Sequence, residues 1–134
     1  MKITNAFFEQ NNTKDSALIR LFECKELPAK VSYWLSRLLQ AMIPLNKIYD
    51  EEKRKIVDKW GEKNEDNTLK LDNEQFTIPS GKIIEFNTEF NELLSIELDI
   101  DIKEIEIPLS KIPNGLLNSF DYGKLTGIIE FKEE

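Results

Sequence analysis

Residues 29–60 carry apolar side chains at a helical spacing over a longer stretch than any other part of the sequence. Steps of three and four residues bring side chains to one face of a helix, so the pattern predicts a single long amphipathic helix with a buried stripe. Pro28 suits the first turn of this helix, and Gly61 is a natural end for it. The apolar positions are Val31, Trp34, Leu35, Leu38, Met42, Leu45, Ile48, Tyr49, Ile56 and Trp60.

Pro44 lies in the middle of this pattern, where it removes a backbone hydrogen bond and clashes with the preceding turn. It leaves two interpretations open, namely one kinked helix or two helices that meet at Ile43. A second helix would need a capping residue near position 43, where isoleucine is a poor cap. The apolar spacing also continues across the proline unchanged. Both observations favour one helix with a kink at Pro44.

A second helix is predicted at 80–95, with Ser80 as its cap, although Glu85 comes too late in the sequence for a capping box. We expect the two helices to form a helical hairpin. In it, Val31, Leu35, Leu38, Met42 and Leu45 would pack on Ile83, Phe86, Phe90 and Leu93. Between the helices, residues 68–71 and 75–78 flank the polar sequence DNE, which predicts a small β-hairpin.

The C-terminal third begins with alternating apolar and charged residues at 98–109. The step of three between Ile102 and Ile105 predicts either a bulge or a junction between two short strands at Lys103–Glu104. Residues 119–131 predict a short last helix with Leu125, Ile128 and Ile129 facing inward. We therefore expect an α+β fold in a single domain, 1–134, with a small C-terminal antiparallel sheet.

The N-terminal region is less clearly patterned. Residues 2–8 fit either a short strand or the start of a helix, and a helix follows from about residue 16, with Asp15 or Ser16 as its cap.

The alternating segment also carries a row of acidic residues, Glu97, Asp99, Asp101, Glu104 and Glu106. Such a row can be a cation site, a partner-binding surface or the solvated face of a sheet. Alternate residues of a strand lie about 6.5–7 Å apart, which is too far for a compact cation site without further ligands. We expect a solvated face, with Asp99 and Asp101 as candidates for partner binding in the minority interpretation.

The sequence contains no histidine, which excludes Ser-His-Asp and Cys-His catalysis and histidine-ligated zinc. Its five glycines are scattered singly, so no glycine-rich phosphate loop is present. Cys24 is the only cysteine, and its apolar neighbours indicate a buried thiol. We expect no metal, no cofactor and no enzymatic activity, although catalysis by carboxylates alone stays open as a third hypothesis.

Four aromatic residues in the long helix, Tyr33, Trp34, Tyr49 and Trp60, fit either the core or a partner-binding surface, and their spacing favours the core. Of these, Trp34, Tyr49 and Trp60 are candidate partner-binding residues. The net charge of −7 opposes direct binding to nucleic acid or anionic lipid. The N-terminal residues lack the pattern of a signal peptide, and no apolar run approaches about 20 residues, so we expect a cytoplasmic protein without a membrane span.

Residues 27–100 resemble a family of small uncharacterised proteins encoded by bacteriophages and prophages. Where the family most often has a glycine in a turn after the aromatic-Gly-Glu sequence, this chain has Asn67. The resemblance implies a phage origin, and hence the cytoplasm of a bacterial host, and no particular chemistry. The residues that carry it are Leu27-Pro28-x-Lys30, Tyr33-x-Leu35, Glu52-x-Arg54, Lys59-Trp60-Gly61-Glu62, the acidic 64–67, and Phe90-x-Glu92-Leu93.

Two functions from different classes fit these features. The first is a non-enzymatic phage accessory or assembly protein that acts through protein–protein contacts, with a homo-oligomer left open. The alternative is an acidic inhibitor that occupies the basic groove of a host or defence nucleic-acid-binding protein. An inhibitor would need its acidic side chains on one convex face, whereas an assembly protein would need an apolar patch.

Overall fold

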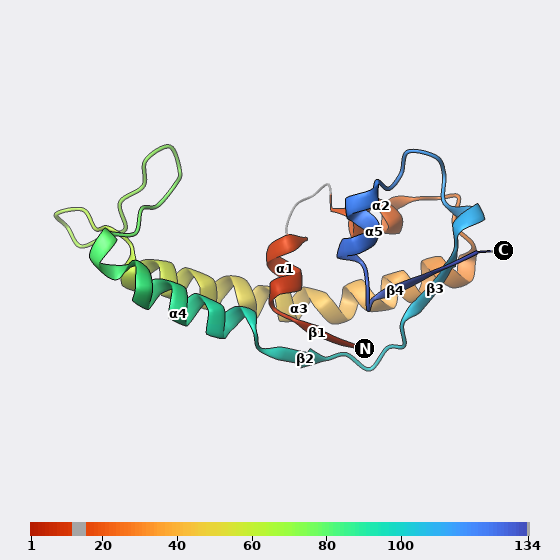
Figure 1. Ribbon diagram of the computed structural model, residues 1–134, viewed down its shortest axis with the longest axis horizontal. Coiled ribbons are helices and arrows are strands. Elements are labelled where there is room, and N and C mark those ends of the chain that lie inside the picture. Colours follow the sequence, from red (N-terminus) through yellow and green to blue (C-terminus); the bar gives the residue numbers. More distant parts are fainter. Residues whose placement is uncertain (12–15, 134) are drawn as a thin grey trace.

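The computed structural model describes residues 1–11 and 16–133 and combines helices with two small sheets (Figure 1). In chain order the elements are β1 (Lys2–Thr4), α1 (Ala6–Gln10), α2 (Ala17–Glu23), α3 (Ala29–Trp60), the 3-10 turn η1 (Ser80–Lys82), α4 (Ile83–Leu94), β2 (Glu97–Asp99), β3 (Ile105–Pro108), the 3-10 turn η2 (Leu109–Lys111), α5 (Ser119–Lys124) and β4 (Ile129–Lys132). The α+β class is therefore confirmed, and residues 2–8 contain both a strand and the start of a helix.

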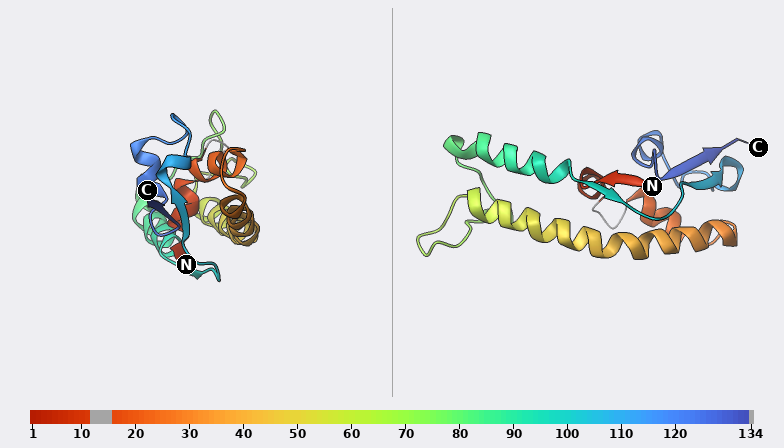
Figure 2. Two further views of the ribbon diagram at one scale, coloured as in Figure 1. Left: turned by 90° about the vertical axis from the view of Figure 1, so that its right-hand side faces the viewer. Right: turned by 90° about the horizontal axis from the view of Figure 1, so that it is seen from below.

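Helix α3 has the predicted bounds, and Pro44 lies inside it without dividing it (Figure 2). The proline and Gln40, whose carbonyl loses its helical donor, are both exposed, so water can satisfy that carbonyl. The interpretation as one helix is confirmed.

The buried stripe of α3 is covered by different elements along its length. Helix α2 and strand β3 pack on the N-terminal half of α3, and α4 returns alongside its C-terminal half (Figures 1 and 2). The prediction that Val31, Leu35 and Leu38 pack on α4 is therefore wrong, because these residues lie in the half that α2 and β3 cover. The buried residues of α3 are Val31, Leu35, Leu38, Met42, Tyr49 and Val57.

Helix α4 contributes less to the core than its pattern predicts. Leu93 is its buried residue, Phe86 and Phe90 are partly buried, and Ile83 is exposed. The rings of Phe86 and Phe90 stack with their centroids 5.6 Å apart. Ser80 begins η1 and does not cap α4, whose N-cap is Lys82 without a side-chain cap bond.

The two sheets differ from the expected C-terminal antiparallel sheet. Strand β2 pairs antiparallel with β1 from the N-terminus, and β3 pairs parallel with β4. A parallel pair needs a crossover connection, which η2 and α5 supply between β3 and β4. Leu125, Ile128 and Ile129 are buried as predicted, but Ile129 belongs to a strand and not to the last helix.

The loop between α3 and η1 does not form the predicted hairpin of 68–71 with 75–78. It contains only isolated bridges, Lys63 with Leu69 and Asp72 with Gln75. Leu71 and Phe76 are exposed, so little apolar burial is available to hold longer strands. Asn67 has a φ of 67°, a conformation that glycine and asparagine tolerate best.

The cap of α2 and the break between β2 and β3 agree better with the sequence-based expectations. Ser16 caps α2 by accepting a hydrogen bond from the Ile19 N–H, whereas the other candidate, Asp15, lies outside the described residues. Strands β2 and β3 are separate, so of the two alternatives at Lys103–Glu104 the structure has a junction between strands and not a bulge. Among the described residues, no helix has the length and apolar character needed to cross a membrane.

Replacing Leu38 with Ala should lower the free energy of unfolding by about 2–5 kcal/mol, because Leu38 is fully buried and the shortened side chain leaves a cavity. Chemical denaturation measures the loss. The matched variant Ile43→Ala, at an exposed position of the same helix, should change stability by less than about 0.5 kcal/mol. Similar losses in both variants would contradict the assigned orientation of α3.

Candidate protein-binding groove

An open groove of about 930 Å³ lies between the start of α3 and the segment that leads into β3. One wall is formed by the first turns of α3, and the other by the segment from Asp101 to Pro108 with the end of β4. Its lining residues, together called the Trp34 groove, are Pro28, Lys30, Val31, Trp34, Asp101, Ile102, Lys103, Glu104, Ile105, Glu106, Pro108, Lys132 and Glu133.

Trp34 is the large aromatic side chain of the groove, and 37% of its surface is exposed. The Tyr33 ring meets it edge to face with centroids 5.3 Å apart, and the Arg37 guanidinium lies 5.9 Å from each ring centroid. Arg37 also donates a hydrogen bond to the Tyr33 hydroxyl. These contacts hold the indole in place, so a ligand would meet a preorganised aromatic wall.

The opposite wall owes its position to buried isoleucines. Ile100, Ile102 and Ile105 point into the core, which leaves Asp101 exposed at the groove. The amino group of Met1 donates hydrogen bonds to the carbonyls of Ile100 and Ile102 at 2.6 and 2.7 Å, and these bonds fix the turn.

Charges of both signs surround the apolar floor of Val31, Ile102 and Ile105. Lys132 lies 3.4 Å from a carboxylate oxygen of Glu106 and 3.4 Å from one of Glu130, and the negative charge of Glu106 raises the pKa of the Lys132 ammonium. Lys30 and Lys103 add positive charge, and Asp101, Glu104 and Glu133 add negative charge. The groove is therefore mixed in charge, unlike the uniformly acidic face that the sequence suggests.

The five acidic residues of the row do not converge on one site. Glu97 and Asp99 are exposed on β2, whereas Asp101, Glu104 and Glu106 are exposed at the groove. No group of three or more His, Cys, Asp or Glu residues that could hold a metal ion occurs in the described part of the chain. This arrangement fits a solvated face, part of which borders the groove.

The candidate aromatic residues are not brought together. Trp34 and Trp60 are separated by 26 residues of one helix, or about 39 Å along its axis. Trp60 is partly buried at the far end, beneath the ammonium groups of Lys59 and Lys82. The prediction that Trp34 is a core residue is wrong, since the neighbouring Leu35 takes the buried position.

Tyr49 is buried and has a structural partner of its own. Its hydroxyl donates a hydrogen bond to Glu9 of α1, and Lys53 forms an ion pair with the same carboxylate. Burial and the bond to Glu9 raise the pKa of the phenol. For Glu9, burial alone would raise the pKa of the carboxyl group, but Lys53 and Tyr49 together lower it. Tyr49 therefore joins α1 to α3 and is not accessible to a partner.

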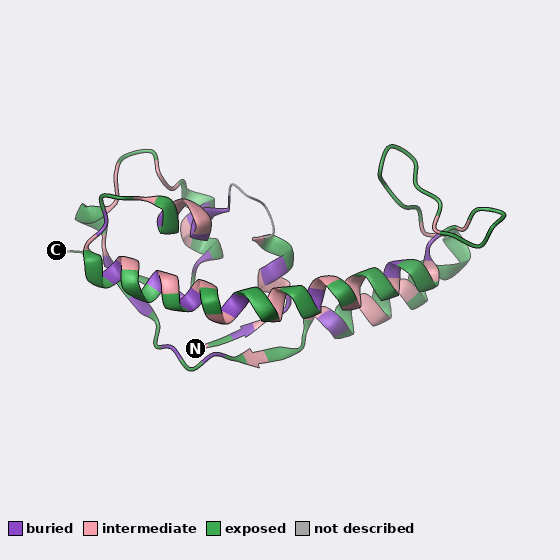
Figure 3. Ribbon diagram, turned by 180° about the vertical axis from the view of Figure 1, so that it is seen from behind, coloured by how far each residue is buried: buried purple, intermediate pink, exposed green. Residues whose placement is uncertain are grey.

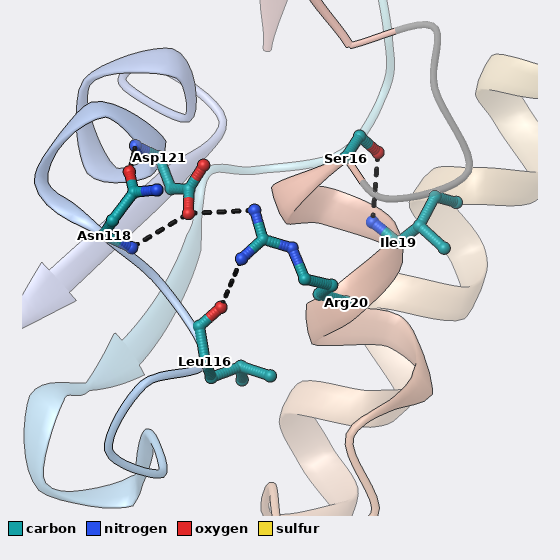
Figure 4. Close-up of polar contacts among 6 residues, drawn as sticks. All are labelled: Ser16, Ile19, Arg20, Leu116, Asn118 and Asp121. Carbon is teal, nitrogen blue, oxygen red and sulfur yellow. Dashed lines mark hydrogen bonds and ion pairs between the residues drawn. The ribbon is translucent and has the colours of Figure 1, made fainter.

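A polar cluster that the sequence analysis missed joins α2 to α5 beside the groove elements (Figure 4). Arg20 donates to the Leu116 carbonyl at 2.6 Å and forms an ion pair with the buried Asp121 at 2.9 Å. Asp121 also accepts from the Asn118 N–H, and the Asn118 side chain accepts from the Asp121 N–H. The signal was present in the spacing Asn118-x-x-Asp121, which fits a capping box.

No protein-family model, curated protein or solved structure matches this chain.

Replacing Asp99 and Asp101 together with Asn should change the free energy of unfolding at neutral pH by no more than about 1 kcal/mol, because both carboxylates are exposed. Denaturant titration of the double variant measures the change. A loss of several kcal/mol would contradict the interpretation of this row as a solvated face.

Replacing Asp121 with Asn should cost roughly 2–4 kcal/mol at neutral pH, because Arg20 loses the charge of a buried partner. Burial alone would raise the pKa of the Asp121 carboxyl group, but the Asn118 N–H and Arg20 lower it below its ordinary value. The unfolded chain therefore takes up this proton first as the pH falls, so the stabilisation is complete above about pH 5 and decreases at more acidic pH. Urea titrations from pH 7 to pH 2 should show a weaker acid dependence in the variant, and equal dependence in both proteins would contradict this assignment.

Proposed function

We propose that this chain is a non-enzymatic phage accessory or assembly protein that binds a partner protein in the Trp34 groove. The observation that carries the proposal is the exposed Trp34 at an apolar floor with a mixed charged rim. Tryptophan is enriched among the residues that dominate protein–protein binding energy, and an apolar centre with a polar rim is the usual anatomy of such interfaces.

The phage origin in this proposal is supported by the resemblance of residues 27–100, and the site of action is accordingly the cytoplasm of the bacterial host. Helices α3 and α4 serve in it as a helical hairpin, and the groove lies at the start of α3, beyond the part that α4 covers. The inhibitor hypothesis requires a uniformly acidic face, and the groove fits it less well because Lys30, Lys103 and Lys132 stand among its carboxylates.

Capture of the partner from lysate of infected cells, followed by mass spectrometry and a binding titration, tests this function. Trp34→Ala and Glu104→Lys should each weaken binding of the captured partner, and the loss for Trp34→Ala should be about thirtyfold if this residue is a hot spot worth 2 kcal/mol. Both residues are exposed, so the variants should remain folded.

The matched controls lie outside the groove. Phe120→Ala removes an exposed aromatic side chain from α5, and Glu92→Lys reverses an exposed charge on α4. Both controls should bind the partner as the unchanged protein does. Unchanged binding by Trp34→Ala and Glu104→Lys would exclude the groove as the binding site.

A further inference from the structure

Helix α3 has a second stripe beside its buried one, in which Ala41 packs partly against the core and Trp34 lines the groove. Trp34, Arg37, Ala41, Pro44 and Ile48 recur in steps of three and four, which is the spacing of a helix–helix contact. Ile48 is 58% exposed, Pro44 is exposed and Ala41 is partly buried. In Figure 3, where α3 is nearest the viewer, no other described element crosses over it. These five residues are called the outer stripe.

Charge is divided unequally along this helix. Residues 29–49 contain Lys30, Arg37 and Lys47 and no acidic residue, whereas Asp50, Glu51 and Glu52 follow directly. Two outer stripes packed in parallel would place basic residues against basic residues. Two stripes packed antiparallel would place the basic start of each helix beside the acidic segment of the other, which is favourable.

The positions in the stripe also fit an antiparallel pair. Trp34 and Ile48 each lie seven residues from Ala41, and Lys30 and Glu52 each lie eleven residues from it. Seven residues make about two helical turns and eleven make about three. Ala41 and the four residues placed symmetrically about it therefore lie near one face of the helix. Alanine at the centre permits close approach of two helices.

We propose that a second copy of this chain docks on the outer stripe, antiparallel, about a two-fold axis at Ala41. In this dimer Trp34 packs on Ile48 of the partner subunit, and Lys30 forms an ion pair with Glu52 of the partner subunit. Each contact occurs twice because the interface is symmetric. Lys30 and Trp34 also line the Trp34 groove, so the dimer and the partner protein compete for these two side chains.

The existing contacts of the paired charges do not oppose this arrangement. Glu52 forms an ion pair with Lys55 at 2.9 Å, but both side chains are well exposed, and such pairs contribute little to stability. No ion pair between described residues involves Lys30. Glu52 can therefore exchange its ion pair with Lys55 for one with the partner's Lys30 at little cost in free energy.

Sedimentation equilibrium over a concentration series up to about 100 µM tests the dimer, because a specific helical interface should be populated in that range. Ile48→Glu should give a monomer, whereas Ile84→Glu, at an exposed position of α4 outside the stripe, should leave the dimer unchanged. Circular dichroism confirms that both variants are folded. A monomer of the unchanged protein at every concentration, or a dimer that persists in Ile48→Glu, would overturn the proposal.

A charge exchange tests the antiparallel register. Lys30→Glu and Glu52→Lys should each weaken the dimer roughly tenfold or more, since each places like charges together at two symmetric positions. The double variant should recover the dimer, and a double variant as weak as the single ones would overturn the register.

Crosslinking gives an independent measurement of the axis. In a Cys24→Ser background, Ala41→Cys should form an intermolecular disulfide under mild oxidation, whereas Lys55→Cys, 14 residues from the axis, should not. Crosslinking of both variants to the same extent would show random collision and would overturn the proposed axis.

Discussion

A helix of 32 residues spans about 48 Å, whereas a compact domain of 134 residues has a radius of gyration of only about 14 Å. Helix α3 therefore cannot be enclosed, and its stability depends on one continuous buried stripe that different elements cover in succession. Helix α2 and strand β3 cover the first half, α1 contacts the middle through the bond between Glu9 and Tyr49, and α4 covers the end. The elongated shape follows from this division (Figure 1).

The helices could be predicted from the sequence because their pattern is local. The bounds of α3 match the apolar repeat. Its pairs of adjacent apolar residues show what the repeat alone cannot predict, namely which member of each pair is buried. Trp34 and Leu35, like Ile48 and Tyr49, are neighbours about 100° apart on the helix, so both members of a pair cannot point to the centre of one narrow core. In each pair the second residue is buried, and the spacing alone could not distinguish them.

The sheets and the groove depend on contacts between distant segments, which periodicity does not report. The same alternation that predicts β3 gives no indication that its neighbour is β4 in parallel, and Ile129 fits a helix as well as a strand. The groove was missed for the same reason, because its walls come from the start of α3, the segment before β3 and the end of β4. The acidic row was placed correctly at the surface, since burial of Ile100 and Ile102 forces Asp99 and Asp101 outward.

The pairing of β1 with β2 joins residues almost a hundred positions apart, and Arg20 and Asp121 are separated by 101 positions. Loops of this length form slowly, because their closure entropy must be overcome before any contact is gained. On the ribosome, α3 leaves the exit tunnel long before β2, β3 and α5 are synthesised. Helices α1 and α2 precede α3 in the chain and can already pack on it, whereas the part of the apolar stripe that β3 covers stays exposed until residues 105–108 emerge.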